Sequence, residues 1–275
     1  MASSPPCCNG QQSFTITSRI KLNRHKDRGS HAVQKVYEIL DEARVCHVSY
    51  VPPPPSSLSP EENEKKITKT NAKASSTPPI VSIPQLYGRS GDWLYLHGSI
   101  SASMMKRSRP PKNALETTTE TPTPKGVPLQ CVVSVTLIDA LVLARALFSH
   151  SMNYRSVVIF ADEVYPVTSD EEKNFALKVI SDNTLKGRWD DDNTRKPNPG
   201  ELQSTGVIKI RLSECSAKIR NGPPGDSKAD LWRTCWAGVV PIKTYFGAPV
   251  PDKACEDASV PLPPYITERF LKRED

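Results

Sequence analysis

The sequence has no long apolar run. None of its hydrophobic stretches approaches the ~20 residues that a membrane-spanning helix needs, and charged residues make up 24% of the 275 positions. The N-terminal residues MASSPPCCNGQQSF contain neither the apolar core of a secretory signal nor the Arg-rich pattern of a transit peptide. These absences predict a water-soluble protein that makes no membrane contact and resides in the cytoplasm.

Cysteine pairs and the common catalytic motifs are also missing. No two of the seven cysteines have the Cys-x-x-Cys spacing of a zinc or redox site. The sequence contains no Gly-rich phosphate loop, no paired-histidine zinc helix and no serine elbow. Several cysteines lie in apolar runs such as VCHV and QCVVSV. We therefore predict reduced thiols that act as small core residues, and no metal site.

A concentrated basic stripe is absent as well. The 36 Lys and Arg residues exceed the 30 Asp and Glu residues, which gives a net charge of +6 and a pI near 8.9. Proteins that bind nucleic acids usually gather such charge on one face, with aromatic residues between the cations. Here the two signs alternate along most of the chain, so we expect no nucleic-acid partner.

Proline, by contrast, is abundant. Twelve of the 26 prolines fall in residues 52–79 and 107–128, which are rich in Ser, Thr, Glu and Lys and offer almost nothing to bury. Such compositions do not offset the entropy lost on ordering, so both segments are predicted to be mobile insertions. The flanking sequence is typical of one continuous core. We predict a disordered tail over residues 1–22, a single domain over 23–266 and a C-terminal tail over 267–275.

The remaining segments favour strands over helices. VCHVSYV, LQCVVSVTL, SVVIFADEVYPV, GVIKIRL and WAGVVPIKTYFG are rich in β-branched residues, and the turn GRSGD joins IVSIPQLY to WLYLHGS in a hairpin. The stretch DALVLARALF fits a helix or a strand. Ser169 and Glu172 form a capping box for one helix. Six or seven short strands with two or three helices predict a closed or half-open antiparallel barrel.

The stretch LHGSISASMMK carries the donors that a phosphate group requires. The hydroxyls of Ser99, Ser101 and Ser103 and the ammonium of Lys106 follow a glycine that allows close backbone approach. A capped turn that starts a helix explains the same residues equally well.

Several ordered motifs together resemble one known family. They are RHKDRGSH, YLHGSISASMM, VTLIDALVLARALFSHSMNYRSVVIF, GRW, SAKIRNGPP, WAGVVPIKTYFGAPVPD and VPLPPYI, and they run from about residue 24 to residue 266. In this order they resemble the flavin-nucleotide-binding proteins related to pyridoxamine 5'-phosphate oxidase. The resemblance implies the FMN-binding split barrel, a six-stranded antiparallel Greek-key barrel with peripheral helices. It also implies a homodimer with an FMN at each end of the interface.

The resemblance further implies which residues contact the cofactor. The backbone of Ile83 and Pro84 would follow the pyrimidine edge of the flavin, and the end of the hairpin would bind its phosphate and ribityl chain. The segment NYRS would lie at the cofactor, with Arg155 binding phosphate through two hydrogen bonds. Trp236 resembles an aromatic residue that approaches from the other subunit, with a plain core role as the alternative. The full set of candidates is Ile83, Pro84, His97, Gly98, Ser99, Ser103, Lys106, Thr136, Tyr154, Arg155, Ser156 and Trp236.

The function implied by the resemblance is an FMN-dependent oxidoreductase that acts on a small molecule, without assigned catalytic residues. One alternative is a flavin- or haem-binding protein without turnover, in which His97 or His47 ligates iron. A second alternative is a true pyridoxamine 5'-phosphate oxidase. Those enzymes hold their substrate partly with a C-terminal Arg-x-His element, and the C-terminal third of this sequence contains no histidine. A third alternative is an interaction protein whose PPPP segment binds partner domains.

Overall fold

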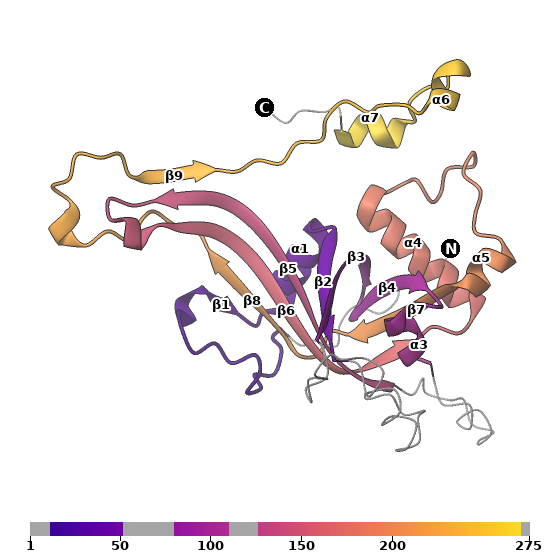
Figure 1. Ribbon diagram of the computed structural model, residues 1–275, viewed down its shortest axis with the longest axis horizontal. Helices are drawn as coiled ribbons and strands as arrows, with labels where there is room; N and C mark the ends of the chain where they lie inside the picture. The colour runs from indigo at the N-terminus through magenta and orange to yellow at the C-terminus, as the bar shows by residue number, and fades with distance from the viewer. Residues whose placement is uncertain (1–11, 52–79, 110–125, 271–275) are drawn as a thin grey trace, which may run out of the picture.

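The computed structural model describes residues 12–51, 80–109 and 126–270. The predicted insertion at 52–79 lies wholly outside the described residues, as does most of the predicted insertion at 107–128. Strands dominate the described part, and a few helices surround them (Figure 1). No helix in these three ranges is long and apolar enough to cross a bilayer.

The secondary structure follows the predicted order. The strands are β1 (Gly29–Ser30), β2 (Val45–Tyr50), β3 (Val81–Ser90), β4 (Trp93–Ser99), β5 (Val127–Leu143), β6 (Ser151–Pro166), β7 (Thr205–Arg211), β8 (Cys215–Arg220) and β9 (Gly238–Pro241). The helices are α1 (Val33–Glu42), α3 (Ser103–Arg107), α4 (Asp170–Leu185), α5 (Pro199–Ser204), α6 (Lys253–Asp257) and α7 (Pro264–Phe270), with short 3-10 turns η1 (Lys26–Arg28), η3 (Leu147–Ser149) and η4 (Lys228–Asp230). The ambiguous stretch DALVLARALF continues β5 as a strand up to Leu143, because it pairs with β6 there.

Six strands close into an antiparallel barrel. The hydrogen-bonded order is β6, β7, β4, β3, β2 and β5, and the pairing of β5 with β6 closes the ring. The predicted fold, a mainly β protein built on a six-stranded split barrel, is confirmed. Alternate residues of each strand face the barrel interior, as Val48 on β2 and Val133 on β5 illustrate with no exposed surface. Helix α1 packs against the same core through Val36 and Leu40.

Helix α4 covers the outer face of β3 and β4. The side chains of Tyr95 on β4 and Ile180 on α4 lie in one small apolar cluster. Gly88 on β3 makes the close approach possible, because a Cβ atom there would lie 2.6 Å from the backbone of Val179. The Ser169 side chain caps the N-terminus of α4 by accepting a hydrogen bond from the Glu172 amide. This is one half of the predicted capping box, because the Glu172 carboxylate accepts a hydrogen bond from Lys209 instead.

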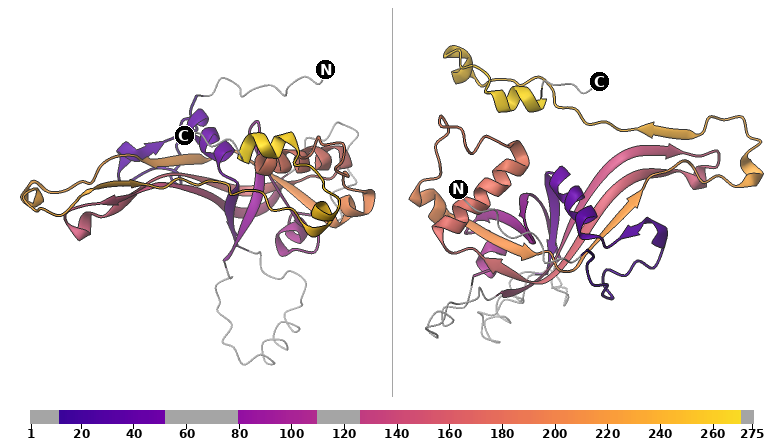
Figure 2. Two further views of the ribbon diagram at one scale, coloured as in Figure 1. Left: turned by 90° about the horizontal axis from the view of Figure 1, so that it is seen from above. Right: turned by 180° about the vertical axis from the view of Figure 1, so that it is seen from behind.

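Strands β5 and β6 are longer than the other four barrel strands. Their ends extend beyond the barrel, and this extension is here called the arm. Their ends form a hairpin that curves away from the barrel in both views, with β9 alongside β5 (Figures 1 and 2). The chain after β9 runs back over the barrel toward α4, where α7 lies (Figure 2). This returning segment carries several exposed apolar side chains, among them Tyr245 and Val250.

Two sequence-based expectations need correction. Residues 12–22, expected in a disordered tail, pack on the domain, because Phe14 and Ile20 are apolar and become buried in the core. Residues 267–270, expected in the C-terminal tail, belong to α7. The basic stretch SAKIRNGPP begins as strand β8, because Ala217 and its neighbours alternate with the polar residues and pair with β6.

The cysteine prediction is confirmed for three positions. Cys46, Cys131 and Cys215 are buried free thiols in the core, and burial raises the pKa of Cys46 and of Cys131 to about 12. These thiols are protonated and behave as small apolar side chains. Cys235 is exposed and Cys255 is partly exposed, so neither is a core residue.

Candidate functional site

The barrel is split between β3 and β4. These strands pair only from Tyr87↔Leu96 to Ser90↔Trp93. The first half of β3, up to Leu86, pairs with β2 instead, and the last residues of β4 pair only with β7. Among the described residues, the edge of β3 that faces away from β2 therefore has no strand partner between Val81 and Leu86. Its backbone groups remain available to a ligand.

The side chain of Gln85 spans this split. Its Nε2 atom donates a hydrogen bond to the carbonyl oxygen of His97 at 3.2 Å. Its Oε1 atom is buried and lacks a partner among the described residues, and so does Nδ1 of His97. Buried polar atoms are seldom left unpaired in native proteins, so a ligand that supplies donors to them fits this place.

His97 is a neutral imidazole in this setting. Burial lowers its pKa, because desolvation disfavours the charged ring. Alternation along β4 puts His97 on the outer face with Tyr95, whereas Leu96 faces the interior. The neutral ring offers one donor and one acceptor nitrogen to whatever lies against the outer side of the split.

Gly98 and the serines that follow β4 offer fewer free groups to a phosphate than the sequence predicts. A Cβ atom on Gly98 would lie 3.4 Å from the Met105 side chain, an ordinary contact, so close packing does not require a glycine there. The hydroxyls of Ser99 and Ser101 bond to each other at 2.8 Å, and Ser103 accepts a hydrogen bond from Arg107 at 3.0 Å. The stretch therefore forms a turn that starts α3, as the alternative interpretation predicts, but the N-cap residue is Ala102 and no side chain caps this helix. Ser99, Ser103 and Lys106 are exposed, and their contact with a phosphate stays a prediction.

Strand alternation divides the NYRS segment between two faces. Tyr154 and Ser156 pair with Ile138 and Thr136, and these four side chains share the outer face of the sheet. Arg155 points the opposite way, toward helix α1. The three residues therefore do not face one cofactor together.

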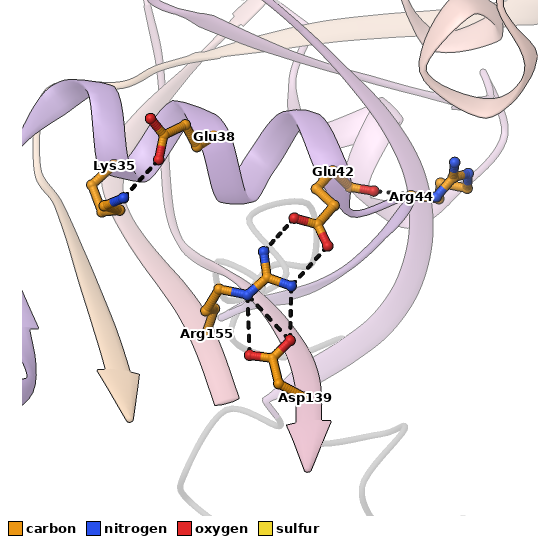
Figure 3. A network of polar contacts seen from close by, with 6 residues as sticks. All are labelled: Lys35, Glu38, Glu42, Arg44, Asp139 and Arg155. Carbon is orange, nitrogen blue, oxygen red and sulfur yellow. Dashed lines mark hydrogen bonds and ion pairs between the residues drawn. The ribbon is translucent and has the colours of Figure 1, made fainter. Parts of the chain in front are cut away.

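Arg155 is held by two carboxylates. Its guanidinium donates hydrogen bonds to both oxygens of Glu42 at the end of α1 and to both oxygens of Asp139 on β5 (Figure 3). Hydrogen bonding to Arg155 lowers the pKa of Glu42. One cation with two carboxylates has a net charge of −1, so this cluster does not attract a phosphate dianion. Arg155 links α1 to the β5–β6 sheet through these two carboxylates, and its contact with a phosphate stays a prediction.

The outer face of the barrel wall gathers the other candidates. Pro84 on β3, His47 on β2 and Ser134 on β5 are cross-strand neighbours in one row. Thr136 lies two residues further along β5 and is exposed. Ile83, by contrast, faces inward and packs against the core.

Trp236 lies on the arm, directly before β9, and 64% of its surface is exposed. It therefore has no core role within this chain. The arm and the returning segment expose further large apolar side chains, here called the arm patch: Leu147, Phe148, Trp232, Trp236 and Tyr245.

Sequence reasoning missed Gln85. The pattern does contain a signal, because Gln85 occupies an inward position between Ile83 and Tyr87, both of which pack in the core. A polar residue at such a position needs a partner in the interior. Across the described ranges, no group of three or more His, Cys, Asp or Glu side chains is placed to hold a metal ion.

The six strands of this protein form a closed ring, but β3 and β4 separate from each other beyond Tyr87 and Leu96. This arrangement defines the class of split-barrel proteins. The family model described as pyridoxamine 5'-phosphate oxidase matches residues 74–219, more than half of the chain. The protein belongs to this family. No curated protein matches the sequence.

Two solved structures share the fold over most of their length. A flavocytochrome from Azotobacter vinelandii is 25% identical, with a TM-score of 0.68 over 92% of this chain and 98% of its own. A FAD- and haem-binding protein from Mycobacterium smegmatis is 26% identical, with a TM-score of 0.65 over 88% of this chain and 97% of its own.

Proposed function

We propose that the protein binds FMN at the split between β3 and β4 and acts as an oxidoreductase on a small molecule. The observation that carries the proposal is the split itself, where Gln85 Oε1 and His97 Nδ1 are buried and have no partner in the part of the chain that the structure describes. The proposal is supported by family membership and by the fold shared with two proteins whose names specify a flavin or a flavocytochrome.

The chain supplies donors and acceptors that suit a flavin ring. The pyrimidine edge carries an N–H group between two carbonyls, and the free edge of β3 offers backbone groups near Ile83 and Pro84. Gln85 Oε1 is an acceptor for that N–H group. Bound FMN would supply hydride or electron transfer, whereas the protein orients the ring and sets its electrostatic surroundings.

An absorbance spectrum of the purified full-length protein tests the proposal. We expect flavin absorbance that a reductant bleaches, and FMN as the flavin that heat releases. Gln85→Leu should lower flavin retention through dialysis, whereas Gln203→Leu, an exposed glutamine on α5, should not. Absence of a flavin, both as purified and after incubation with FMN or FAD, would refute the proposal. Release of FAD would correct the cofactor.

Haem binding is the second candidate function. It is favoured by the two structural relatives, whose names include haem or a cytochrome, and by the neutral state of the His97 imidazole. Neutral imidazole is the form that ligates a metal. A Soret band that His97→Leu abolishes and His47→Leu preserves would assign the iron ligand. If the protein is incubated with haem and then shows flavin absorbance but no Soret band, this candidate is eliminated.

We also propose a cytoplasmic homodimer, in which a second copy covers the arm patch. Monomers seldom expose so many large apolar side chains together, and Phe148 at the tip of the arm is fully exposed. The second copy would place Trp236 near the flavin site of its partner. The five cysteines of the described ranges are all free, as a reducing compartment leaves them. A flavin-loaded monomer in sedimentation experiments would contradict the shared interface.

A further inference from the structure

The returning segment, residues 242–263, is attached at both ends and buries little in between. At its start, the Ile242 amide donates a hydrogen bond to the carbonyl oxygen of Asp139 on β5 at 2.9 Å. Further on, the guanidinium of Arg44 lies over the Phe246 ring, 5.2 Å from its centroid. Beyond Phe246, almost every residue up to α7 is exposed. The segment crosses the domain toward α4 with few contacts of its own (Figure 2).

Apolar side chains of the returning segment have no cover among the described residues. Val250 is 89% exposed, and Tyr245 and Val260 are exposed as well. Beside the segment, the cross-strand pair Val45 and Leu86 is also exposed. Monomers seldom expose so many apolar groups together. A second copy of this chain is the occupant that fits, because the surface continues into the arm patch through Tyr245, and the same copy would cover both.

Tyr265 on α7 fixes the far end of the returning segment. Its phenol accepts a hydrogen bond from Arg188 at 2.8 Å and donates one to the carboxylate of Asp191 at 2.7 Å. Its ring packs on Gly187, directly after α4, where an added Cβ atom would lie 3.1 Å from the Tyr265 Cβ atom. Gly187 also has a φ of 94°, which favours glycine. These four residues, here called the latch, form a socket for one phenol.

Both hydrogen bonds of the latch involve a charged group. The bond from Tyr265 lowers the pKa of Asp191, so its carboxylate is ionised near neutral pH. Such charge-assisted bonds are roughly twice as strong as bonds between neutral groups. Within the described ranges, they are also the only hydrogen bonds that join residues 247–268 to the rest of the chain. The polar attachment of α7 therefore depends on one phenolic oxygen atom.

We propose that the arm and the returning segment form a clasp that closes around a second copy of the chain, and that Tyr265 controls its opening. The proposal rests on the homodimer of the proposed function, in which the second copy contributes Trp236 to the flavin site. A copy held by a segment that is attached at both ends leaves only when one end opens. The β9 end is held by strand pairing with β5, so the latch is the end that opens. Tyr265 therefore sets the rate at which the two copies separate.

Subunit exchange tests the clasp. Full-length protein of natural isotopic composition is mixed with protein labelled with heavy nitrogen, and mixed dimers are followed by native mass spectrometry. Tyr265→Phe keeps the ring but removes both hydrogen bonds of the latch. It should speed exchange by at least about tenfold, because a hydrogen bond to a charged group is commonly worth more than the 1.4 kcal/mol of one decade. Arg188→Gln, which weakens the same latch, should speed exchange in the same direction.

Tyr165→Phe is the matched control. The Tyr165 phenol also donates a hydrogen bond to a carboxylate, that of Glu163, but it lies at the opposite end of β6 from the arm. Its exchange rate should equal that of the unmodified protein. Equal acceleration by Tyr165→Phe and Tyr265→Phe would overturn the clasp. A monomer in sedimentation would refute the homodimer and the clasp together, whereas flavin-loaded dimers that exchange at the same rate with and without Tyr265→Phe would refute the clasp alone.

Discussion

Replacing Arg155 by alanine separates the two roles considered for this residue. The sequence resemblance implies a phosphate contact, so that interpretation predicts loss of FMN. In the structure the guanidinium binds Glu42 and Asp139 on the face that meets α1. We therefore expect Arg155→Ala to lower the free energy of unfolding and to leave flavin content unchanged.

The size of the effect follows from the exposure of the three groups. The side chains of Arg155, Glu42 and Asp139 are 30%, 52% and 35% exposed, so solvent screens both ion pairs. Exposed pairs contribute about 0.2–1 kcal/mol each, and the two carboxylates left behind repel each other. We expect a loss of about 1–2 kcal/mol. For a chain of this size each kcal/mol lowers Tm by roughly 2–4 °C.

The effect should depend on pH in a defined direction. In the folded protein, Arg155 lowers the pKa of Glu42 below its usual value of 4.5. Stability from this pair is therefore fully present above the unfolded pKa and is lost as the pH falls through the folded pKa. The difference in Tm between Arg155→Ala and the unmodified protein should be constant near neutral pH and shrink below pH 4.5.

Thermal unfolding followed by circular dichroism and the ratio of flavin to protein absorbance give the two readouts. Arg155→Lys is the matched variant, because it keeps the charge but loses the paired hydrogen bonds, and its Tm should fall between the other two. Reduced flavin content at unchanged Tm would refute the reasoning and restore Arg155 to the cofactor site.

Three further predictions concern packing, assembly and a helix cap. Gly88→Ala should lower the free energy of unfolding by denaturant by about 3 kcal/mol, because the new Cβ would lie 2.6 Å from the backbone of α4. Gly91→Ala, in an open turn, should lower it by about 1 kcal/mol. Equal losses in the two variants would argue against the close packing of Gly88 on α4. Phe148→Ser should shift sedimentation toward the monomer without changing the flavin content, and an unchanged dimer would exclude the tip of the arm from the interface. Hydrogen bonds from Arg195 and from the Asn198 backbone lower the pKa of Glu201 to about 2. The difference in stability between the unmodified protein and Glu201→Gln should therefore persist above pH 4.5 and vanish as the pH falls toward 2. A difference that grows in acid would contradict this cap.

The sequence predicted the barrel because strand signals are local. Alternating apolar residues and the turn GRSGD specify a hairpin without knowledge of distant contacts, and β3 and β4 form as expected. The stretch DALVLARALF was undecidable for the opposite reason. Its local pattern fits both states, and only pairing with β6 selects the strand.

The candidate site was predicted less well. Neighbours in sequence were assumed to act together, although adjacent residues of a strand point to opposite faces. This assumption placed Arg155 beside Tyr154 and Ser156, whereas its partners Glu42 and Asp139 come from elements distant in the chain. Gln85 was missed because its importance depends on the separation of β3 from β4.

The amino-acid sequence alone predicts the hairpin of β3 and β4, the Ser169 cap of helix α4, the buried thiols and the family, because each depends on local periodicity or on ordered motifs. Which side chains meet depends on how the strands and helices pack. Ring closure, the split beside Gln85 and the pairing of Arg155 with two carboxylates arise from contacts across the fold. The burial and charge that control such contacts are properties of the assembled surfaces, and no single segment of the sequence contains them.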